Sequence, residues 1–148
     1  VIAAPWVAEP FWRPGAGLWR HGYTYSGHAA AAAAALANLD VLEREALPKR
    51  ALELEGDLAE ALAPLAEHPL VGEVRAGTGV LGAVQFADDA LEAEPALPAR
   101  AVAAGRRNGI LTRALGIGAL QISPPLVIDR AHIDKIFEIL RTTVRRLG

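Results

Sequence analysis

Two glycine-containing turns, residues 76–79 and 116–118, most constrain the fold of this chain. Each turn separates two short runs rich in β-prone residues, and glycine can adopt the positive φ that tight turns require. The predicted hairpins pair residues 71–75 with 80–86, and residues 110–113 with 119–123. Neither turn lies between a strand and a helix, so neither is interpreted as a phosphate-binding loop.

An alanine- and leucine-rich stretch from His28 to Ala46 predicts a long helix, with Ser26 as its N-cap. Its small side chains suit close packing on several sides, so we expect its N-terminal half to be buried. Residues 1–27 are rich in proline, glycine and aromatic residues, which predicts a loop with at most a short helical turn. We expect this segment to pack against something outside the chain.

Three further helices are predicted around the hairpins. The first begins at Pro48, since proline fits the first turn of a helix, and the second covers residues 95–108 with Gly109 as a left-handed C-cap. The third follows the N-cap Asp129. The first carries a stripe of Leu52, Leu58, Leu62 and Leu65, and the third one of Ile133, Ile136, Phe137, Leu140, Val144 and Leu147. Helices alternating with hairpins predict an α+β fold, an antiparallel sheet covered by helices.

Composition excludes several classes of protein. The 148 residues are 52% hydrophobic with a net charge of -2 and no basic stripe, which argues against nucleic-acid binding. The chain has no cysteine, and its four histidines show no metal-ligand spacing, so no metal site is predicted. The apolar stretch 28–41 contains Asn38 and Asp40 and is shorter than the ~20 residues of a bilayer span, so no membrane helix is predicted. The chain starts at Val1 without a signal peptide, which predicts a cytoplasmic protein cut from a longer polypeptide.

The segment Arg20-His21-Gly22-Tyr23-Thr24-Tyr25-Ser26-Gly27-His28, followed by the alanine-rich helix, resembles the signature of class III aminotransferases, which use pyridoxal 5'-phosphate (PLP). Val7-Ala8-Glu9-Pro10-Phe11-Trp12 and Ser123-Pro124-Pro125-Leu126-Val127-Ile128 resemble two further family segments in the same order. The chain departs mildly from the family at Ala29, where proline is usual, and in the register of the first hairpin turn.

The resemblance covers essentially the whole chain and implies the C-terminal portion of a fold type I, aspartate aminotransferase-like PLP-dependent enzyme. In that architecture residues 1–27 are a cofactor-loop remnant of the large domain. Residues 28–47 form a long interdomain helix, and residues 48–148 form the C-terminal α+β small domain.

The resemblance also implies site residues. Thr24 corresponds to the threonine that donates to the PLP phosphate in the neighbouring subunit of a homodimer, and Gly22 and Tyr23 line that site. Arg113 corresponds to the arginine that holds the substrate carboxylate, a task for which a planar guanidinium suits because it can donate two parallel hydrogen bonds. From the residues alone, Thr24 also fits an ordinary aromatic loop, and Arg113 a solvated strand.

Such an enzyme needs a lysine that forms a Schiff base with PLP, and the two lysines here, Lys49 and Lys135, lack the family's surrounding sequence. No catalytic residue is therefore assigned, and the isolated chain is expected to be inactive. The intact enzyme would transfer an amino group between an amine or amino acid and a keto acid. An aminomutase or decarboxylase on the same scaffold is an alternative. Another is a non-catalytic chain that associates with itself through aromatic residues, namely Trp6, Phe11, Trp12, Trp19, Tyr23 and Tyr25.

Overall fold

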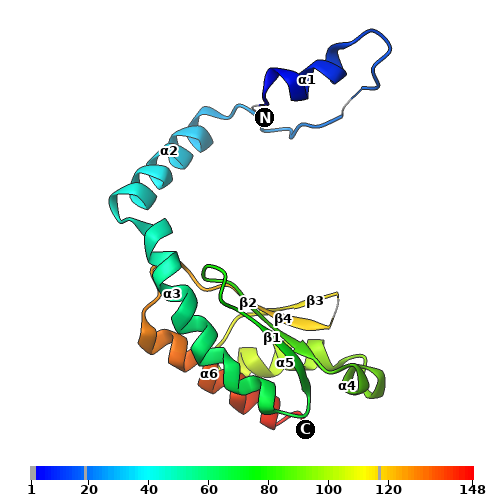
Figure 1. Ribbon diagram of the computed structural model, residues 1–148, viewed down its shortest axis with the longest axis vertical. Coiled ribbons are helices and arrows are strands. Elements are labelled where there is room, and N and C mark those ends of the chain that lie inside the picture. The colour runs from blue at the N-terminus through cyan, green and yellow to red at the C-terminus, as the bar shows by residue number, and fades with distance from the viewer. Residues whose placement is uncertain (1–2, 19, 117) are drawn as a thin grey trace. The chain divides into compact units, whose positions relative to one another are not determined.

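The chain divides into two compact units, Val1–Leu39 and Asp40–Gly148 (Figure 1). The computed structural model describes residues 3–18, 20–116 and 118–148, so Trp19 of the aromatic opening and Ile117 of the second turn lie outside the described residues. Within those described ranges, no helix is both long and apolar enough to cross a membrane.

The two predicted hairpins pair into a single antiparallel sheet in the second unit. Strands β1 (Val71–Arg75) and β2 (Gly82–Phe86) form the first hairpin, and β3 (Arg113–Leu115) and β4 (Ala119–Ile122) form the second. The strand order is β1-β2-β4-β3, so the hairpins join through β2 and β4 at the centre of the sheet (Figure 1). Both predicted hairpins are confirmed, and the sheet belongs to an α+β fold.

The start of β3 differs from the prediction. Strand β3 begins at Arg113, whereas the sequence predicted a strand over 110–113. The preceding residues instead close helix α5 (Leu97–Arg107): Gly109 has a φ of +96° and donates to the Arg106 carbonyl, and Ile110 donates to the Gly105 carbonyl at 3.0 Å. These two bonds form a Schellman motif around the predicted glycine C-cap. Ile110 therefore hydrogen-bonds to the end of α5 and is not part of β3.

Helices α3 (Leu47–Leu62), α5 and α6 (Arg130–Arg145) share one hydrophobic core with the sheet (Figure 1). A 3-10 helix, η1 (Ala63–Glu67), follows α3, and a short helix that the sequence did not predict, α4 (Asp88–Ala93), follows β2. The core side chains least exposed to solvent are Leu58, Leu62, Val84, Phe86, Leu97, Ala101, Ala119, Leu120, Ile133, Leu140 and Val144. The predicted stripe of α6 is confirmed at Ile133, Leu140 and Val144, and Asp129 caps that helix by accepting a hydrogen bond from the His132 N–H.

The predicted stripe of α3 contains one error. Leu52 is 64% exposed, whereas Leu54 is buried together with Leu58 and Leu62. Leu54, Leu58, Ala61 and Leu62 follow the i, i+4, i+7, i+8 spacing of one helix face, and Leu52 lies off that face. The helix is therefore amphipathic as predicted, with a stripe displaced by two residues at its start.

The first unit contains α1 (Pro5–Trp12), which corrects the prediction of a loop with at most one helical turn. Pro5 occupies the first turn, where its fixed φ suits a helix and its missing N–H removes no helical bond. Arg13 pairs with Glu9 at 3.0 Å, one turn earlier along the chain. Pro5 thus fits the start of a two-turn helix, whereas Pro10 lies inside that helix, where it removes one N–H donor.

Helix α2 (Ala29–Arg44) confirms the predicted long helix but corrects two details. Ser26 does not cap it, because the Ser26 hydroxyl accepts from the N–H of Tyr23, and His28 takes the capping role by accepting from the Ala31 N–H at 3.1 Å. No residue of α2 is buried, so the expected burial of its N-terminal half is wrong for this chain. The alanine face meets no covering side chains among the described residues.

Candidate functional site

Gly22, Tyr23 and Thr24 lie on a tight turn in the first unit. The Ser26 N–H donates to the Tyr23 carbonyl at 3.0 Å, and the Tyr23 N–H donates to the Ser26 hydroxyl at 3.1 Å. This double link places Thr24 and Tyr25 at the two central positions of a β-turn. Ser26, predicted as a helix cap, thus fixes the turn that carries the predicted cofactor residues.

The turn presents hydrogen-bond donors that the described chain does not use. The backbone N–H groups of Thr24 and Tyr25 and the hydroxyl of Thr24 make no hydrogen bond to another described residue. The side of Gly22 on which a Cβ would stand has no atom within 4 Å. Adjacent donors beside an unobstructed glycine can converge on an anion such as a phosphate, so the residues present fit the phosphate of PLP.

Arg113 lies in the second unit, at the first residue of the edge strand β3. Its cross-strand partner is Gln121 of β4, and the Arg113 Nε donates to Gln121 Oε1 at 2.7 Å. The Thr112 hydroxyl donates to the Gln121 backbone carbonyl at 2.6 Å, which ties the entry of β3 to β4. These residues line an open concavity of about 470 Å³ together with Leu111 and Ser123. An exposed guanidinium at such a concavity can bind a carboxylate.

The predicted site residues therefore fall into two groups. Gly22, Tyr23 and Thr24 are brought together on one turn, and Arg113 lies in the other unit. Gln121 is the residue at this site that sequence reasoning missed. The sequence carried no usable signal for Gln121, because its place opposite Arg113 depends on a strand register that the predicted run 110–113 did not give.

The two lysines lie on the surface of this chain. The Lys49 side chain is 79% exposed, and its ammonium lies 3.7 Å from a carboxylate oxygen of Glu53. Lys135 is exposed on α6 and borders a groove between that helix and the segment 109–111. Within the described part of the chain, no group of three or more His, Cys, Asp or Glu residues could hold a metal ion.

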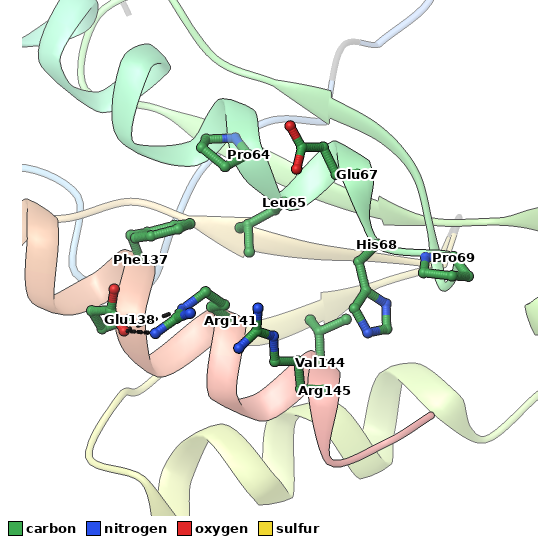
Figure 2. Close-up of a pocket in the computed structure, with 10 residues that line it drawn as sticks. All are labelled: Pro64, Leu65, Glu67, His68, Pro69, Phe137, Glu138, Arg141, Val144 and Arg145. Carbon is green, nitrogen blue, oxygen red and sulfur yellow. Dashed lines mark hydrogen bonds and ion pairs between the residues drawn. The ribbon is translucent and has the colours of Figure 1, made fainter.

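A second concavity, of about 390 Å³, lies between η1 and α6 and contains none of the predicted site residues (Figure 2). Arg141 donates to Glu138 at 2.6 Å and lies 6.0 Å from the centre of the Phe137 ring. The Leu70 N–H donates to His68 Nδ1 at 3.2 Å. Arg141 and His68 thus have protein partners already, and we assign no catalytic role to this concavity.

Comparison with known proteins identifies relatives over most of the chain. The family "Aminotransferase class-III" matches residues 6–144. An uncharacterized aminotransferase y4uB of Sinorhizobium fredii is 41% identical over 136 residues, which cover 87% of this chain and 29% of that protein. The putrescine–pyruvate aminotransferase of Pseudomonas aeruginosa is 38% identical over 84% of this chain and 28% of its own length. The chain thus spans less than a third of these curated relatives.

Solved structures agree with this family. An amine transaminase from an uncultivated Pseudomonas species, in its PLP-bound form, is 39% identical with a TM-score of 0.75, over 86% of this chain and 30% of that one. An (S)-enantioselective omega-transaminase from Thermomicrobium roseum is 37% identical with a TM-score of 0.75, over 88% of this chain and 30% of that one. In sequence and in fold, the chain belongs to the class III aminotransferases.

Proposed function

We propose that this chain is the C-terminal part of a PLP-dependent aminotransferase that transfers an amino group between an amine or amino acid and a keto acid. The observation that carries the proposal is the turn at residues 23–26, whose unused donors stand beside an open glycine in a chain of this family. Relatives named as a diaminobutyrate–2-oxoglutarate transaminase from Halomonas elongata and a putrescine–pyruvate aminotransferase support an amine donor and a keto-acid acceptor.

In this proposal the Thr24 hydroxyl and nearby backbone N–H groups bind the phosphate of PLP, and Gly22 and Tyr23 line its site. When bound, PLP supplies an electron sink for the carbon that carries the amino group. Arg113 binds the carboxylate of the keto acid or amino acid and orients it by two parallel hydrogen bonds. This chain supplies residues that bind the cofactor phosphate and the substrate carboxylate, whereas the lysine that holds the cofactor covalently belongs to the remainder of the enzyme.

We further propose that residues 1–27 belong to the large domain, residues 28–47 connect the domains and residues 48–148 form the small domain. The absence of buried residues in α2 supports a covering surface supplied by the remaining part of the enzyme. Trp6, Trp12 and Tyr25 are 77%, 84% and 81% exposed, and an aromatic surface of this kind supports association into a homodimer. A chain without cysteine suits the reducing cytoplasm, where we place the enzyme.

The test begins with the intact mass of the protein purified from its natural source, followed by PLP, borohydride reduction and peptide mapping. We expect a longer polypeptide with one modified lysine outside residues 1–148. A specific adduct at Lys49 or Lys135 would contradict the proposal. Product analysis then separates transamination, in which the amino group appears on the keto acid, from decarboxylation, which releases carbon dioxide, and from the aminomutase alternative, in which the group moves within one molecule.

A further inference from the structure

We infer that Gln121 is a positioning residue for Arg113: it holds the guanidinium through Nε without neutralising its charge, and so sets how the enzyme recognises a substrate carboxylate. This inference rests on the proposed role of Arg113 in binding that carboxylate. It adds Gln121 to the site of Arg113 and specifies how a substrate carboxylate contacts the guanidinium.

Gln121 is well placed to fix an otherwise mobile side chain. Arg113 is exposed at the end of an edge strand, where a long side chain samples many rotamers. Gln121 lies on the central strand β4, paired with Ala83 on one side and Arg113 on the other. Its own backbone is anchored by the Thr112 hydroxyl at 2.6 Å. The 2.7 Å bond from Arg113 Nε to Gln121 Oε1 therefore ties the guanidinium to the most constrained part of the sheet.

The neutral charge of the partner is the second part of the argument. Arg130 shows the contrasting case, because it contacts three carboxylates, those of Asp57, Glu60 and Asp134, at 3.1, 3.2 and 2.9 Å. Those carboxylates satisfy Arg130 within the protein. No acidic side chain among the described residues forms an ion pair with Arg113. An amide orients the guanidinium and leaves its full positive charge for an external carboxylate.

The bond also restricts how a carboxylate can bind. Because the Nε–H of Arg113 is donated to Gln121, the remaining donors are the four N–H bonds on Nη1 and Nη2. A carboxylate therefore binds end-on, with one oxygen toward each terminal nitrogen, and not side-on across Nε and Nη2. Gln121 borders the same concavity as Arg113, so a change at residue 121 acts directly on this recognition.

The test uses the intact enzyme with variants Gln121→Glu and Gln121→Met, with Gln85→Glu as the matched control. Gln85 lies on β2, pairs with Ala119 and accepts a hydrogen bond from Arg75 at 3.4 Å, so glutamate there adds the same charge to the same sheet beside another arginine than Arg113. We expect Gln121→Glu to raise KM for a keto acid by up to about fivefold, because the new carboxylate competes for the exposed guanidinium.

We expect Gln121→Met, which keeps the length but removes the acceptor, to raise KM for the keto acid about fivefold with little change in kcat, since one oriented hydrogen bond is lost. Reaction of a simple amine with an aldehyde acceptor, which contains no carboxylate, should be unchanged in both variants. The inference is wrong if both variants keep the KM of the parent enzyme for keto acids, or if Gln85→Glu raises it equally. Arg113→Ala distinguishes failure of the Gln121 inference from failure of the proposed role of Arg113. If Arg113→Ala raises KM for the keto acid while the Gln121 variants do not, Arg113 binds the carboxylate without help from Gln121. If Arg113→Ala has no effect on this KM, the proposed role of Arg113 fails as well.

Discussion

The guanidinium of Arg50 donates from Nη2 to the backbone carbonyl of Ile128 at 2.6 Å and from Nε to that of Leu126 at 3.1 Å. This links α3 to the proline-rich segment that leads from β4 into α6. Arg50→Ala should lower the free energy of unfolding by about 1.5–3 kcal/mol, because bonds from a charged donor to partly buried carbonyls are lost. Urea denaturation of the chain measures this. Lys49→Ala, at the exposed neighbouring position, should change stability by less than about 0.5 kcal/mol, and equal losses would contradict the role of Arg50.

Thr24→Ala in the intact enzyme should weaken PLP retention about 10- to 100-fold, the equivalent of one hydrogen bond to a charged phosphate at about 1.5–3 kcal/mol. Equilibrium dialysis against PLP gives the dissociation constant. Thr24→Ser keeps the hydroxyl and should retain most of the affinity. Unchanged affinity in Thr24→Ala would remove Thr24 from the phosphate site.

Arg113→Ala should impair reactions of keto acids far more than those of simple amines, because only the former contain a carboxylate. We expect kcat/KM for keto acids to fall at least about tenfold, as expected for the loss of a charge-assisted bond of about 1.5–3 kcal/mol. Steady-state kinetics with a keto acid and with a carboxylate-free aldehyde as alternative acceptors makes the comparison. Equal losses with both acceptors would show that Arg113 acts on folding or on the cofactor instead.

Leu58→Ala should destabilise the chain by about 2–5 kcal/mol, since Leu58 is fully buried in the hydrophobic core and its truncation leaves a cavity. Leu52→Ala is the matched control on the same helix, at a position that is 64% exposed, and should cost less than about 0.5 kcal/mol. Denaturant midpoints measured for both variants decide between the predicted and the observed stripe. A larger loss at Leu52 would mean that the buried face of α3 has been assigned incorrectly.

Stability in acid should depend on Asp129. The His132 backbone N–H and ring both bond to its carboxylate, at 2.9 and 2.7 Å, which lowers the pKa of Asp129 below its ordinary value of 3.8. A lowered pKa stabilises the folded chain above about pH 4, and this contribution disappears as the pH falls through the lowered value. Asp129→Asn keeps a side chain that caps helices well but cannot titrate. Unfolding measured at neutral pH and at about pH 3 should show a weaker acid dependence in Asp129→Asn, and identical pH profiles would contradict this assignment.

Short sequence patterns predicted the fold of the second unit, because its turns and helix ends depend on the conformation of a few neighbouring residues. The hairpins followed from glycine turns, and the end of α5 followed from Gly109, whose positive φ is a property of the backbone alone. The first unit was harder to predict, since a proline such as Pro5 fits a loop as well as it fits the start of a helix. The expected burial of α2 failed for a different reason. Composition indicates a surface suited to packing, but it does not indicate whether the covering surface lies within the same 148 residues.

The residues of the candidate site also divide into those that a short motif predicts and one that depends on a contact distant in the sequence. Gly22, Tyr23, Thr24 and Arg113 came from short motifs, and their roles stay predictions. Gln121 could not be singled out, because its importance depends on the register that places it opposite Arg113. The sequence predicted a strand that ends at Arg113, whereas β3 begins at Arg113. The predicted register therefore differed from the observed one. A one-residue error in pairing moves every side chain to the other face of a sheet, so cross-strand partners are the least predictable part of such a site.

The sheet order β1-β2-β4-β3 also bears on how fast the chain folds. Each hairpin joins neighbouring segments and can close within microseconds, but the central pairing of β2 with β4 must wait until the segment containing α4 and α5 has looped back. We therefore expect the pairing of β2 with β4 to limit the rate of folding, with both hairpins closed before it. The strand that carries Arg113 would then already be paired with β4 when the two halves of the sheet meet.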